Sequence, residues 1–304
     1  MIKEYICQDG FKEYQSAEKI ALCLGFFDGL HLGHQKLILQ ALKENPNVGV
    51  LTFQGALKRI TSAREDEEIL TSVEDRKELL EKMGIHSLFV VPFDEKIHSM
   101  EAEDFIFSIL KPLNVSAVYI GSDFRFGKGA KGDKELLSKY FDVHTVDFRL
   151  DEEGKKISTS SIIRLIKNGF VEEADKDLGR NYSIRGKIIH GLRNGSTKLG
   201  FPTANISPAD DYVIPMKGVY ATYLNLEGQR YLSMTDIGVH PTINELSTTS
   251  IEVNIFGFEG NVYFENVRLE FLSYLRPETK FASLEELKEQ LSRDKTKIIL
   301  KYKE

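Results

Sequence analysis

The sequence predicts an α/β domain with a parallel sheet, followed by an all-β domain that is a small antiparallel barrel with a terminal helix. In the first half, short apolar runs alternate with amphipathic helical patterns. After roughly Asn181, strand-like runs follow one another closely, separated by Gly and Asn/Gly turns. Alternating strands and helices are typical of parallel sheets, whereas closely spaced short strands are typical of antiparallel barrels or sandwiches. We therefore expect two domains, 1–180 and 181–304.

Hydrophobic periodicity defines the elements of the first half. We expect strands over Ile20–Gly25, Val48–Phe53, Ser87–Pro92, Val115–Gly121 and Val143–Phe148. We expect helices over His34–Lys43, Val73–Met83, Ala102–Leu110 and Lys134–Tyr140. Helices cover both faces of such a sheet, and ligands bind at the carboxyl ends of its strands.

The second half is predicted to contain five strands and one final helix. The strands are expected over Tyr182–His190, Gly218–Leu226, Arg230–Ile237, Ile251–Phe256 and Val267–Tyr274. The helix begins within "FASLEELKEQL", where Ser283 and Glu286 form a capping box. Its Leu284, Leu287 and Leu291 share one face, which we expect to pack against the barrel.

Composition narrows the class of protein. The chain has 304 residues, of which 41% are hydrophobic and 28% charged, and a formal net charge of −6. This charge argues against nucleic acid or a membrane surface as the main partner. Cys7 and Cys23 form no metal-binding or disulfide pattern, and no signal peptide or apolar run of about 20 residues is present. We expect a cytoplasmic protein that acts on small molecules, and the oligomeric state is left open.

The stretch "LGFFDGLHLGH" follows the first predicted strand directly. Its glycines let backbone N–H groups approach a ligand, and the helix that follows directs its positive end to the same place. His31 and His34 are three residues apart, so they project side by side near the start of that helix. This pattern indicates a polyphosphate site. Two other interpretations are a metal site with Asp28 as third ligand and a purely structural role.

A second glycine pattern, Gly127 to Gly132, satisfies GxGxxG, and Asp147 follows at the distance typical of dinucleotide-binding units. This leaves an alternative function as a NAD(P)-dependent oxidoreductase. Against it, Ser122–Phe126 separates the strand from the first glycine, where a tight turn should follow at once. No GxxxxGK[ST] sequence is present, so a P-loop kinase is not expected.

Several motifs together resemble one family. "GFFDGLHLGH" resembles the HxGH signature of nucleotidyltransferases, in the form found in bacterial bifunctional riboflavin kinase/FAD synthetases. "GSDFRFGKGAKGD" (121–133) is similar to the flavin-side loop of that family, and "KISTSSIIRLIKNG" (156–169) to its nucleotide loop. "GLRNGSTKLGFPTANI" (191–206) resembles its flavokinase signature, and "GVYA" and "IEVNIF" follow in the expected order. The resemblance spans nearly the whole chain and implies a Rossmann-like nucleotidyltransferase domain before a riboflavin kinase-like barrel.

For the first domain, the resemblance implies transfer of AMP from ATP to FMN, which gives FAD and pyrophosphate. His31 and His34 would act on the ATP phosphates as catalytic donors, and Asp123, Phe124 and Arg125 would line the flavin side. The other implied ATP-binding residues are Gly25, Phe26, Phe27, Asp28, Ser158, Thr159, Ser160 and Arg164. Ser158–Ser161 could equally be a plain helix cap.

For the second domain, the resemblance implies phosphorylation of riboflavin by ATP, with Mg²⁺ as cofactor. Thr203 and Asn205 of "PTAN" would hold the metal, and Glu252 would be the catalytic base. Arg276 would touch the flavin. A glycine-rich flap over the nucleotide would contain Gly191, Gly195, Thr197, Gly200 and Pro202. A simpler interpretation of Glu252 is a solvent-facing strand residue.

Two departures from the family pattern concern the first domain. The family has Pro-His-Pro after the Thr-Phe of its second strand, whereas this chain continues Thr52-Phe53-Gln54-Gly55. The position of the family's arginine holds Ile163, with Arg164 one residue later, and one residue turns a helical side chain by about 100°. A riboflavin kinase with a weakened or lost adenylyltransferase half that acts as a flavin-binding module is therefore an alternative. Another is a nucleotidyltransferase with a different substrate.

Overall fold

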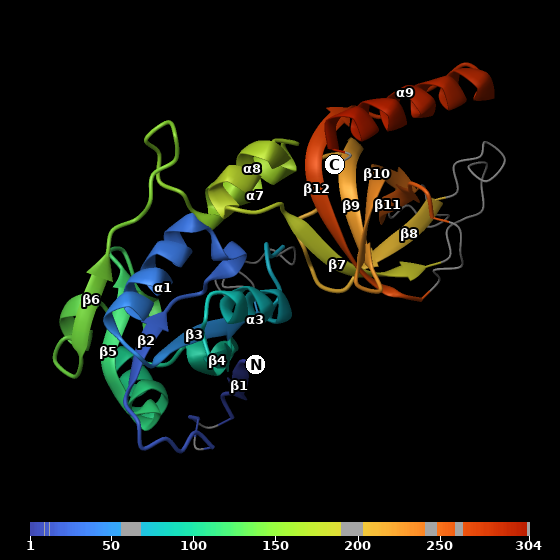
Figure 1. The fold of residues 1–304 in the computed structure, drawn as a ribbon. Coiled ribbons are helices and arrows are strands. Elements are labelled where there is room, and N and C mark those ends of the chain that lie inside the picture. The colour runs from blue at the N-terminus through green and yellow to red at the C-terminus, as the bar shows by residue number, and fades with distance from the viewer. Residues whose placement is uncertain are drawn as a thin grey trace. The chain divides into compact units, whose positions relative to one another are not determined.

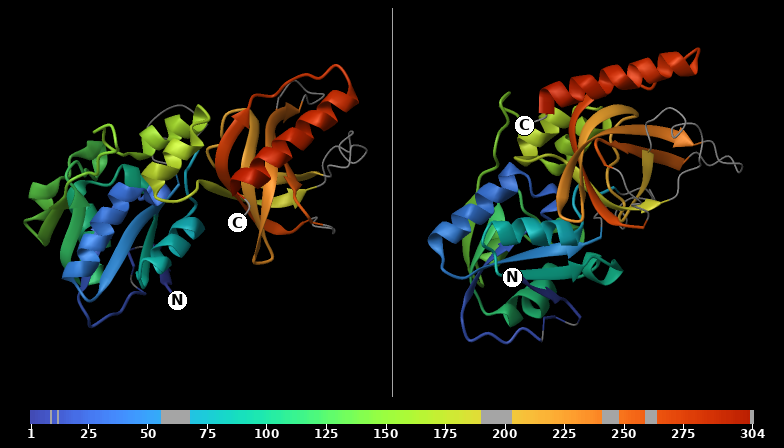
Figure 2. Two further views of the ribbon diagram at one scale, coloured as in Figure 1. Left: turned by 45° about the horizontal axis from the view of Figure 1, so that its top comes forward. Right: turned by 45° about the vertical axis from the view of Figure 1, so that its right-hand side comes forward.

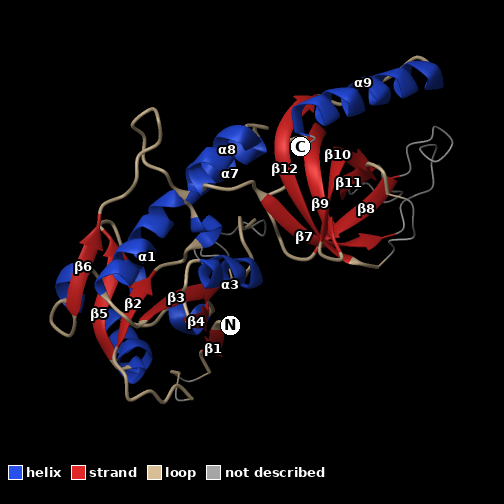
Figure 3. Ribbon diagram, viewed as in Figure 1, coloured by secondary structure: helices blue, strands red, loops and turns tan. Residues whose placement is uncertain are grey.

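The computed structural model describes residues 1–8, 10–11, 13–55, 68–189, 203–240, 248–258 and 264–302. By packing, the chain divides into two compact units, Met1–Thr159 and Ser160–Glu304. The predicted fold class is confirmed: the first unit contains a parallel sheet and the second a closed antiparallel barrel (Figure 1, Figure 3). The domain boundary at 180/181 stays a prediction, and the helical segment before it packs with the barrel unit.

The sheet of the first unit has six parallel strands in the order β1-β4-β3-β2-β5-β6. The strands are β1 (Lys3–Ile6), β2 (Ile20–Leu24), β3 (Val48–Gln54), β4 (Ser87–Pro92), β5 (Val115–Gly121) and β6 (Asp142–Val146). From β2 the chain adds β3 and β4 on one side and β5 and β6 on the other, so the strand order reverses beside β2. Such a point is where open α/β sheets bind their ligands.

Helices cover both faces of this sheet. They are α1 (Leu32–Glu44), α3 (Val73–Lys82), α4 (Glu95–His98), α5 (Ala102–Phe105) continued by a π-helical turn over Ile106–Leu110, and α6 (Lys134–Leu137). Successive side chains of β2 alternate between two cores, with Leu22 packing beside α5 and Cys23 beside α1. The helix predicted over 134–140 ends earlier than expected, at Leu137. The other predicted helices follow the predicted ranges closely.

Strand β1 was not predicted, because its four residues lie at the sheet edge and are at most half-buried. A strand with little buried surface leaves no apolar alternation in the sequence.

The second unit begins with two helices and continues as a barrel. The helices are α7 (Thr159–Lys167) and α8 (Val171–Leu178). The strands are β7 (Ser183–Ile189), β8 (Thr203–Pro208), β9 (Gly218–Leu226), β10 (Gln229–His240), β11 (Thr248–Ile255) and β12 (Asn266–Arg276). They close in the order β10-β11-β8-β7-β12-β9, and Figure 2 shows them curving around a common axis. Strand β8 begins at Thr203 of the "PTAN" motif and was not predicted as a strand.

The terminal helix α9 (Leu284–Tyr302) packs on the outside of the barrel. Glu286 N–H donates to Ser283 Oγ at 3.2 Å, which supports the predicted cap. The prediction that Leu284 faces the barrel is wrong, because its side chain is 60% exposed. The helix contacts the barrel through its later turns, where Leu291, Ile298 and Tyr302 join Met234 of β10 in one cluster.

Candidate functional site

The loop after β2 holds several residues in left-handed backbone conformations. Phe27, Gly29 and Leu30 have φ values of 52°, 76° and 40°. Glycine adopts such angles readily, whereas phenylalanine and leucine adopt them only at a cost in conformational energy. Residues strained in this way cluster at functional sites. The result is a tight turn over Asp28–Leu30 that leads directly into α1.

The two histidines lie at the N-terminus of α1. His31 is its N-cap, and its Nδ1 accepts hydrogen bonds from the N–H groups of Gly33 and His34 at 3.2 and 3.3 Å. Because Nδ1 is an acceptor, the neutral ring carries its proton on Nε2, which becomes a donor. The His31 and His34 rings stack with centroids 3.6 Å apart and an angle of 18°. Two imidazoles and a helix N-terminus at one point are groups that can bind an anion.

The carboxylate of Asp28 is held by the segment before α3. It accepts hydrogen bonds from Leu70 N–H at 3.0 Å and from Thr71 N–H at 2.9 Å, and Thr71 Oγ1 lies 3.1 Å away. Gly29 N–H in turn donates to Thr71 Oγ1 at 2.8 Å. Asp28 therefore organises the loop, and the metal interpretation is not supported. Among the described residues, no group of three His, Cys, Asp or Glu side chains could hold a metal ion.

The predicted nucleotide loop reaches the histidine loop through Thr159, whose Oγ1 donates to the Asp28 carbonyl at 3.1 Å. Ser158 beside it is partly buried. Ser160 and Arg164 lie on α7 with exposed side chains, and their contacts with phosphate stay predictions.

The predicted flavin-side loop contains an ion pair. Lys156 binds Asp123, and this hydrogen bond lowers the pKa of the Asp123 carboxyl below its usual value. Arg125 is exposed and donates to the Phe124 carbonyl at 3.0 Å. The Phe124 ring stacks on the Phe126 ring, with centroids 5.9 Å apart.

Sequence reasoning missed an aromatic cluster beside the histidine loop. The Phe26 ring stacks on Phe53 with centroids 4.6 Å apart, and Phe93 meets both edge-on at 5.3 and 5.7 Å. Phe26, Phe53 and Phe93 each follow or end a strand at the carboxyl edge of the sheet. A phenylalanine at three neighbouring strand ends was the signal in the sequence.

The GxGxxG segment is built differently from a dinucleotide-binding turn. Phe126 and Gly132 exchange backbone hydrogen bonds of 3.1 and 2.8 Å, which close the glycines into a tight loop. The helix after it, α6, has only four residues. This geometry does not favour the oxidoreductase alternative.

In the barrel, strand register brings the predicted kinase residues together. Glu252 of β11 lies directly opposite Asn205 of β8, and Thr203 Oγ1 is 3.4 Å from Glu252 Oε2. On its other side Glu252 lies opposite Asp236 of β10, which sequence reasoning missed. Directly paired residues of antiparallel strands share one face, so these polar side chains form a row. Packing around Asp236, followed by the charges of Glu278 and Glu252, raises the pKa of Asp236 to about 6.

Arg276 ends β12 and binds α9. Its Nε donates to Asp294 Oδ2 at 2.8 Å, and its NH1 donates to the Pro277 carbonyl at 3.1 Å. A contact with flavin stays a prediction. The predicted flap residues Gly191, Gly195, Thr197, Gly200 and Pro202 lie outside the described residues.

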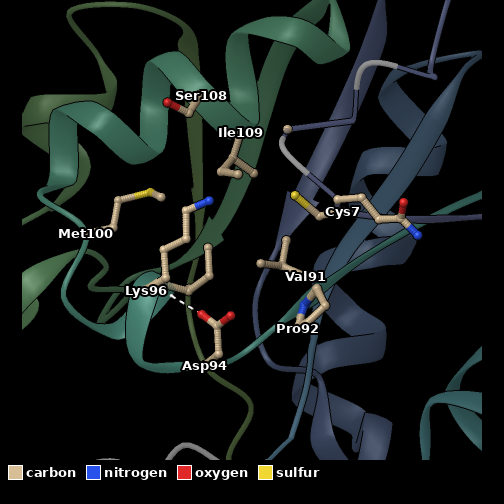
Figure 4. Close-up of a pocket in the computed structure, with 11 residues that line it drawn as sticks. Cys7, Val91, Pro92, Asp94, Lys96, Met100, Ser108 and Ile109 are labelled. Atoms are coloured by element: carbon tan, nitrogen blue, oxygen red, sulfur yellow. Dashed lines mark hydrogen bonds between the residues drawn. The ribbon is translucent and has the colours of Figure 1, made fainter.

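A cavity of about 430 Å³ lies at the ends of β1 and β4 (Figure 4). Cys7 and Met100 lie on opposite walls, with the Lys96 side chain between them. Strand β3 separates β4 from β2, so this cavity opens at a different part of the sheet edge from the histidine loop.

A parallel sheet with two histidines at a helix N-terminus beside its switch point, together with a barrel that carries a polar row, is typical of a two-part nucleotide-dependent transferase. Residues 13–161 match the family model for FAD synthetase, and residues 178–300 match that for riboflavin kinase. The chain belongs to the bifunctional riboflavin kinase/FMN adenylyltransferase family.

Individual relatives cover nearly the whole chain. Over 298 residues the chain is 37% identical to the bifunctional riboflavin kinase/FMN adenylyltransferase of Bacillus subtilis. The alignment covers 95% of this chain and 93% of the relative. The protein of the same name from Listeria monocytogenes is 37% identical, with 93% and 92% covered. A crystal structure described as a macrolide-efflux protein from Streptococcus pneumoniae superposes with a TM-score of 0.87 at 29% identity, covering 96% of this chain and 97% of that one.

No helix within the described residues is long and apolar enough to cross a membrane.

Proposed function

We propose that the two reactions of this family occur at separate sites, adenylyl transfer to FMN at the histidine loop and riboflavin phosphorylation at the polar row of the barrel. The stacked pair of His31 and His34 at the start of α1, next to the Phe26–Phe53 stack, is the observation that supports the first site best. An anion site beside an aromatic surface suits a triphosphate and a flavin.

In the adenylyl transfer, a phosphate oxygen of FMN attacks the α-phosphorus of ATP. The new O–P bond forms as the bond to pyrophosphate breaks. The FMN phosphate is ionised at neutral pH, so the protein needs no strong base, and its work is alignment and charge stabilisation. His31 Nε2–H and His34 donate to the phosphate oxygens, while Thr159 fixes the neighbouring nucleotide loop against Asp28.

In the kinase reaction, the 5′-hydroxyl of riboflavin attacks the γ-phosphorus of ATP, and ADP leaves. Glu252 orients this hydroxyl and accepts its proton. Hydroxyl and amide oxygens are suitable ligands for Mg²⁺, so the donor set of Thr203 and Asn205 fits this ion. When bound, Mg²⁺ neutralises charge on the ATP phosphates. Arg276 would keep the segment after β12 in place next to the flavin.

One assay tests both proposals. The protein is incubated with riboflavin, ATP and Mg²⁺, and FMN and FAD are separated by chromatography. We expect Glu252→Gln to abolish FMN formation from riboflavin while FAD still forms from added FMN. We expect His34→Ala to lower FAD formation by about 10²–10³-fold with FMN formation intact. The opposite assignment of losses, or equal losses in both activities, would refute the separation of sites.

A kinase whose first unit only binds flavin is the second candidate, motivated by the missing Pro-His-Pro histidine and the shifted Arg164. In the same assay it would accumulate FMN without FAD. We further propose a cytoplasmic location and small molecules as the only substrates.

A further inference from the structure

We propose that Arg76 is a positioning residue for adenylyl transfer, because its buried guanidinium fixes the end of β3 against the histidine loop. The inference rests on the proposed function of the first unit. Arg76 lies in the first turns of α3 and is only 4% exposed. Burying a guanidinium costs desolvation free energy, which the hydrogen bonds of Arg76 have to offset.

The guanidinium binds main-chain oxygens from two separate strand ends. Its NH1 donates to the carbonyls of Phe26 at 2.7 Å and Phe53 at 3.0 Å. The same nitrogen lies 2.5 Å from Thr52 Oγ1, and this hydroxyl donates to the Phe26 carbonyl at 2.6 Å. One cation therefore joins the loop after β2 to the end of β3.

The remaining bonds anchor the arginine to its own helix. Nε donates to the Ser72 carbonyl at 3.3 Å, and Ser72 is the N-cap of α3 in a capping box with Asp75. Burial lowers the pKa of Arg76, whereas the charges of Asp28 and Asp75 raise it. A guanidinium stays protonated in proteins, so the cation is present at every working pH.

The atoms that Arg76 holds belong to both halves of the proposed site. Phe26 precedes the left-handed turn that leads to His31, and its ring stacks on that of Phe53. A second tether runs parallel to the first, because Thr71 and Leu70 bind Asp28. The start of α3 thus holds the histidine loop at two points, and of these two tethers the one through Arg76 also reaches β3.

This arrangement sets the distance between the phosphate-binding histidines and the aromatic surface. Adenylyl transfer has no strong base to compensate for poor alignment, so its rate depends on that distance. A displacement of about 1 Å at the reacting atoms costs about 10²-fold in rate. Lysine offers one ammonium point charge in place of the planar fork, so it cannot reproduce the contacts.

The test compares Arg76→Lys with Lys77→Met in the full-length protein. Lys77 is the next residue on α3 and pairs with Glu4 at 2.8 Å, away from the loop. We expect Arg76→Lys to lower kcat for FMN adenylylation by about 10–100-fold, with the KM for ATP changed less than about threefold. Riboflavin kinase kcat, measured on the same sample, stays at the wild-type value. Lys77→Met leaves both reactions unchanged.

A purely structural role would give different results. If the adenylylation kcat of Arg76→Lys equals that of Lys77→Met, either directly or at 10 °C where a destabilised variant refolds, the positioning role is wrong. If Arg76→Lys does not fold, Arg76→Gln decides, because it replaces the guanidinium that binds the Phe26 and Phe53 carbonyls by a shorter, uncharged amide. A several-fold loss of adenylylation supports the proposal, and full activity overturns it. Absence of FAD formation by the wild-type protein would instead reject the proposed function.

Discussion

Arg276, whose side chain is 17% exposed, forms an ion pair with the buried Asp294 between the end of the last barrel strand and the terminal helix, with Nε and Oδ2 2.8 Å apart. Asp294 is 1% exposed, and its other oxygen accepts a hydrogen bond from Gln290 at 2.8 Å. The residue lies in the same stripe of α9 as Leu291 and Ile298, so the helix presents a charge where an apolar side chain is expected. This pair fixes α9 to β12.

Removing one partner of a buried ion pair leaves the other without compensation. We expect Asp294→Ala to lower the free energy of unfolding of the second unit by about 3–5 kcal/mol. Glu289→Ala is the control, because Glu289 pairs with Arg293 on the exposed side of the same helix at 3.8 Å. Its loss should stay below about 1 kcal/mol. Urea denaturation of both variants measures the difference, and equal losses would contradict a special role for Asp294.

Asp28 gives a prediction for the first unit. Asn in its place keeps one acceptor oxygen but loses the negative charge and the second acceptor that hold Leu70 and Thr71. We expect Asp28→Asn to lower FMN adenylylation by about tenfold through a looser histidine loop, without loss of kinase activity. Asp94→Asn is the matched control, since Asp94 caps the exposed helix α4. Wild-type adenylylation by Asp28→Asn would show that the anchor does not matter for rate.

The sequence predicted most of the fold because long apolar alternation and helical periodicity survive in it. It failed at β1, where an edge strand has little to bury, and at Leu284, because spacing alone does not say where a helix meets its partner. The chemical groups of the two candidate sites were predicted from the residue types and from the order of the motifs along the chain. Arg76 and Asp236 were missed for a physical reason. From the sequence, an arginine in a polar helix and an aspartate in a strand are both expected to face solvent, because their partners come from segments that only the tertiary fold brings near.

Arg164 on α7 stands one residue after the position of the family's arginine, and this shift leads to a further prediction. If Arg164 supplies a cation to the nucleotide despite its shift by one position, Arg164→Ala should lower FAD formation several-fold and leave FMN formation unchanged. The adjacent control is Lys167→Ala, which removes a cation in the last turn of the same helix. Separate assays with riboflavin and with FMN as substrate measure the two rates. Unchanged FAD synthesis in Arg164→Ala would exclude a phosphate role for this residue.

Asp175 on α8 makes the stability of the second unit depend on pH. Burial, supported by the charges of Glu172 and Glu270, raises the pKa of this carboxyl to about 8, against the effects of the Tyr182 N–H and Arg180. The unfolded chain loses this proton near pH 4, so between about pH 4 and pH 8 the folded protein binds the extra proton. The contribution of Asp175 to the free energy of unfolding therefore falls as pH rises through this window.

Asp175→Asn removes the titration and keeps an oxygen that can accept the hydrogen bond from Tyr182 N–H, which is 2.6 Å long in the wild type. Relative to the wild type, we expect this variant to gain about 1–3 kcal/mol of stability at pH 8 compared with pH 4.5. Glu173→Gln, at an exposed position of the same helix, should show no such pH-dependent gain. Urea denaturation at several pH values measures the difference. Parallel stability curves for the wild type and Asp175→Asn would mean that this carboxyl ionises normally in the folded protein.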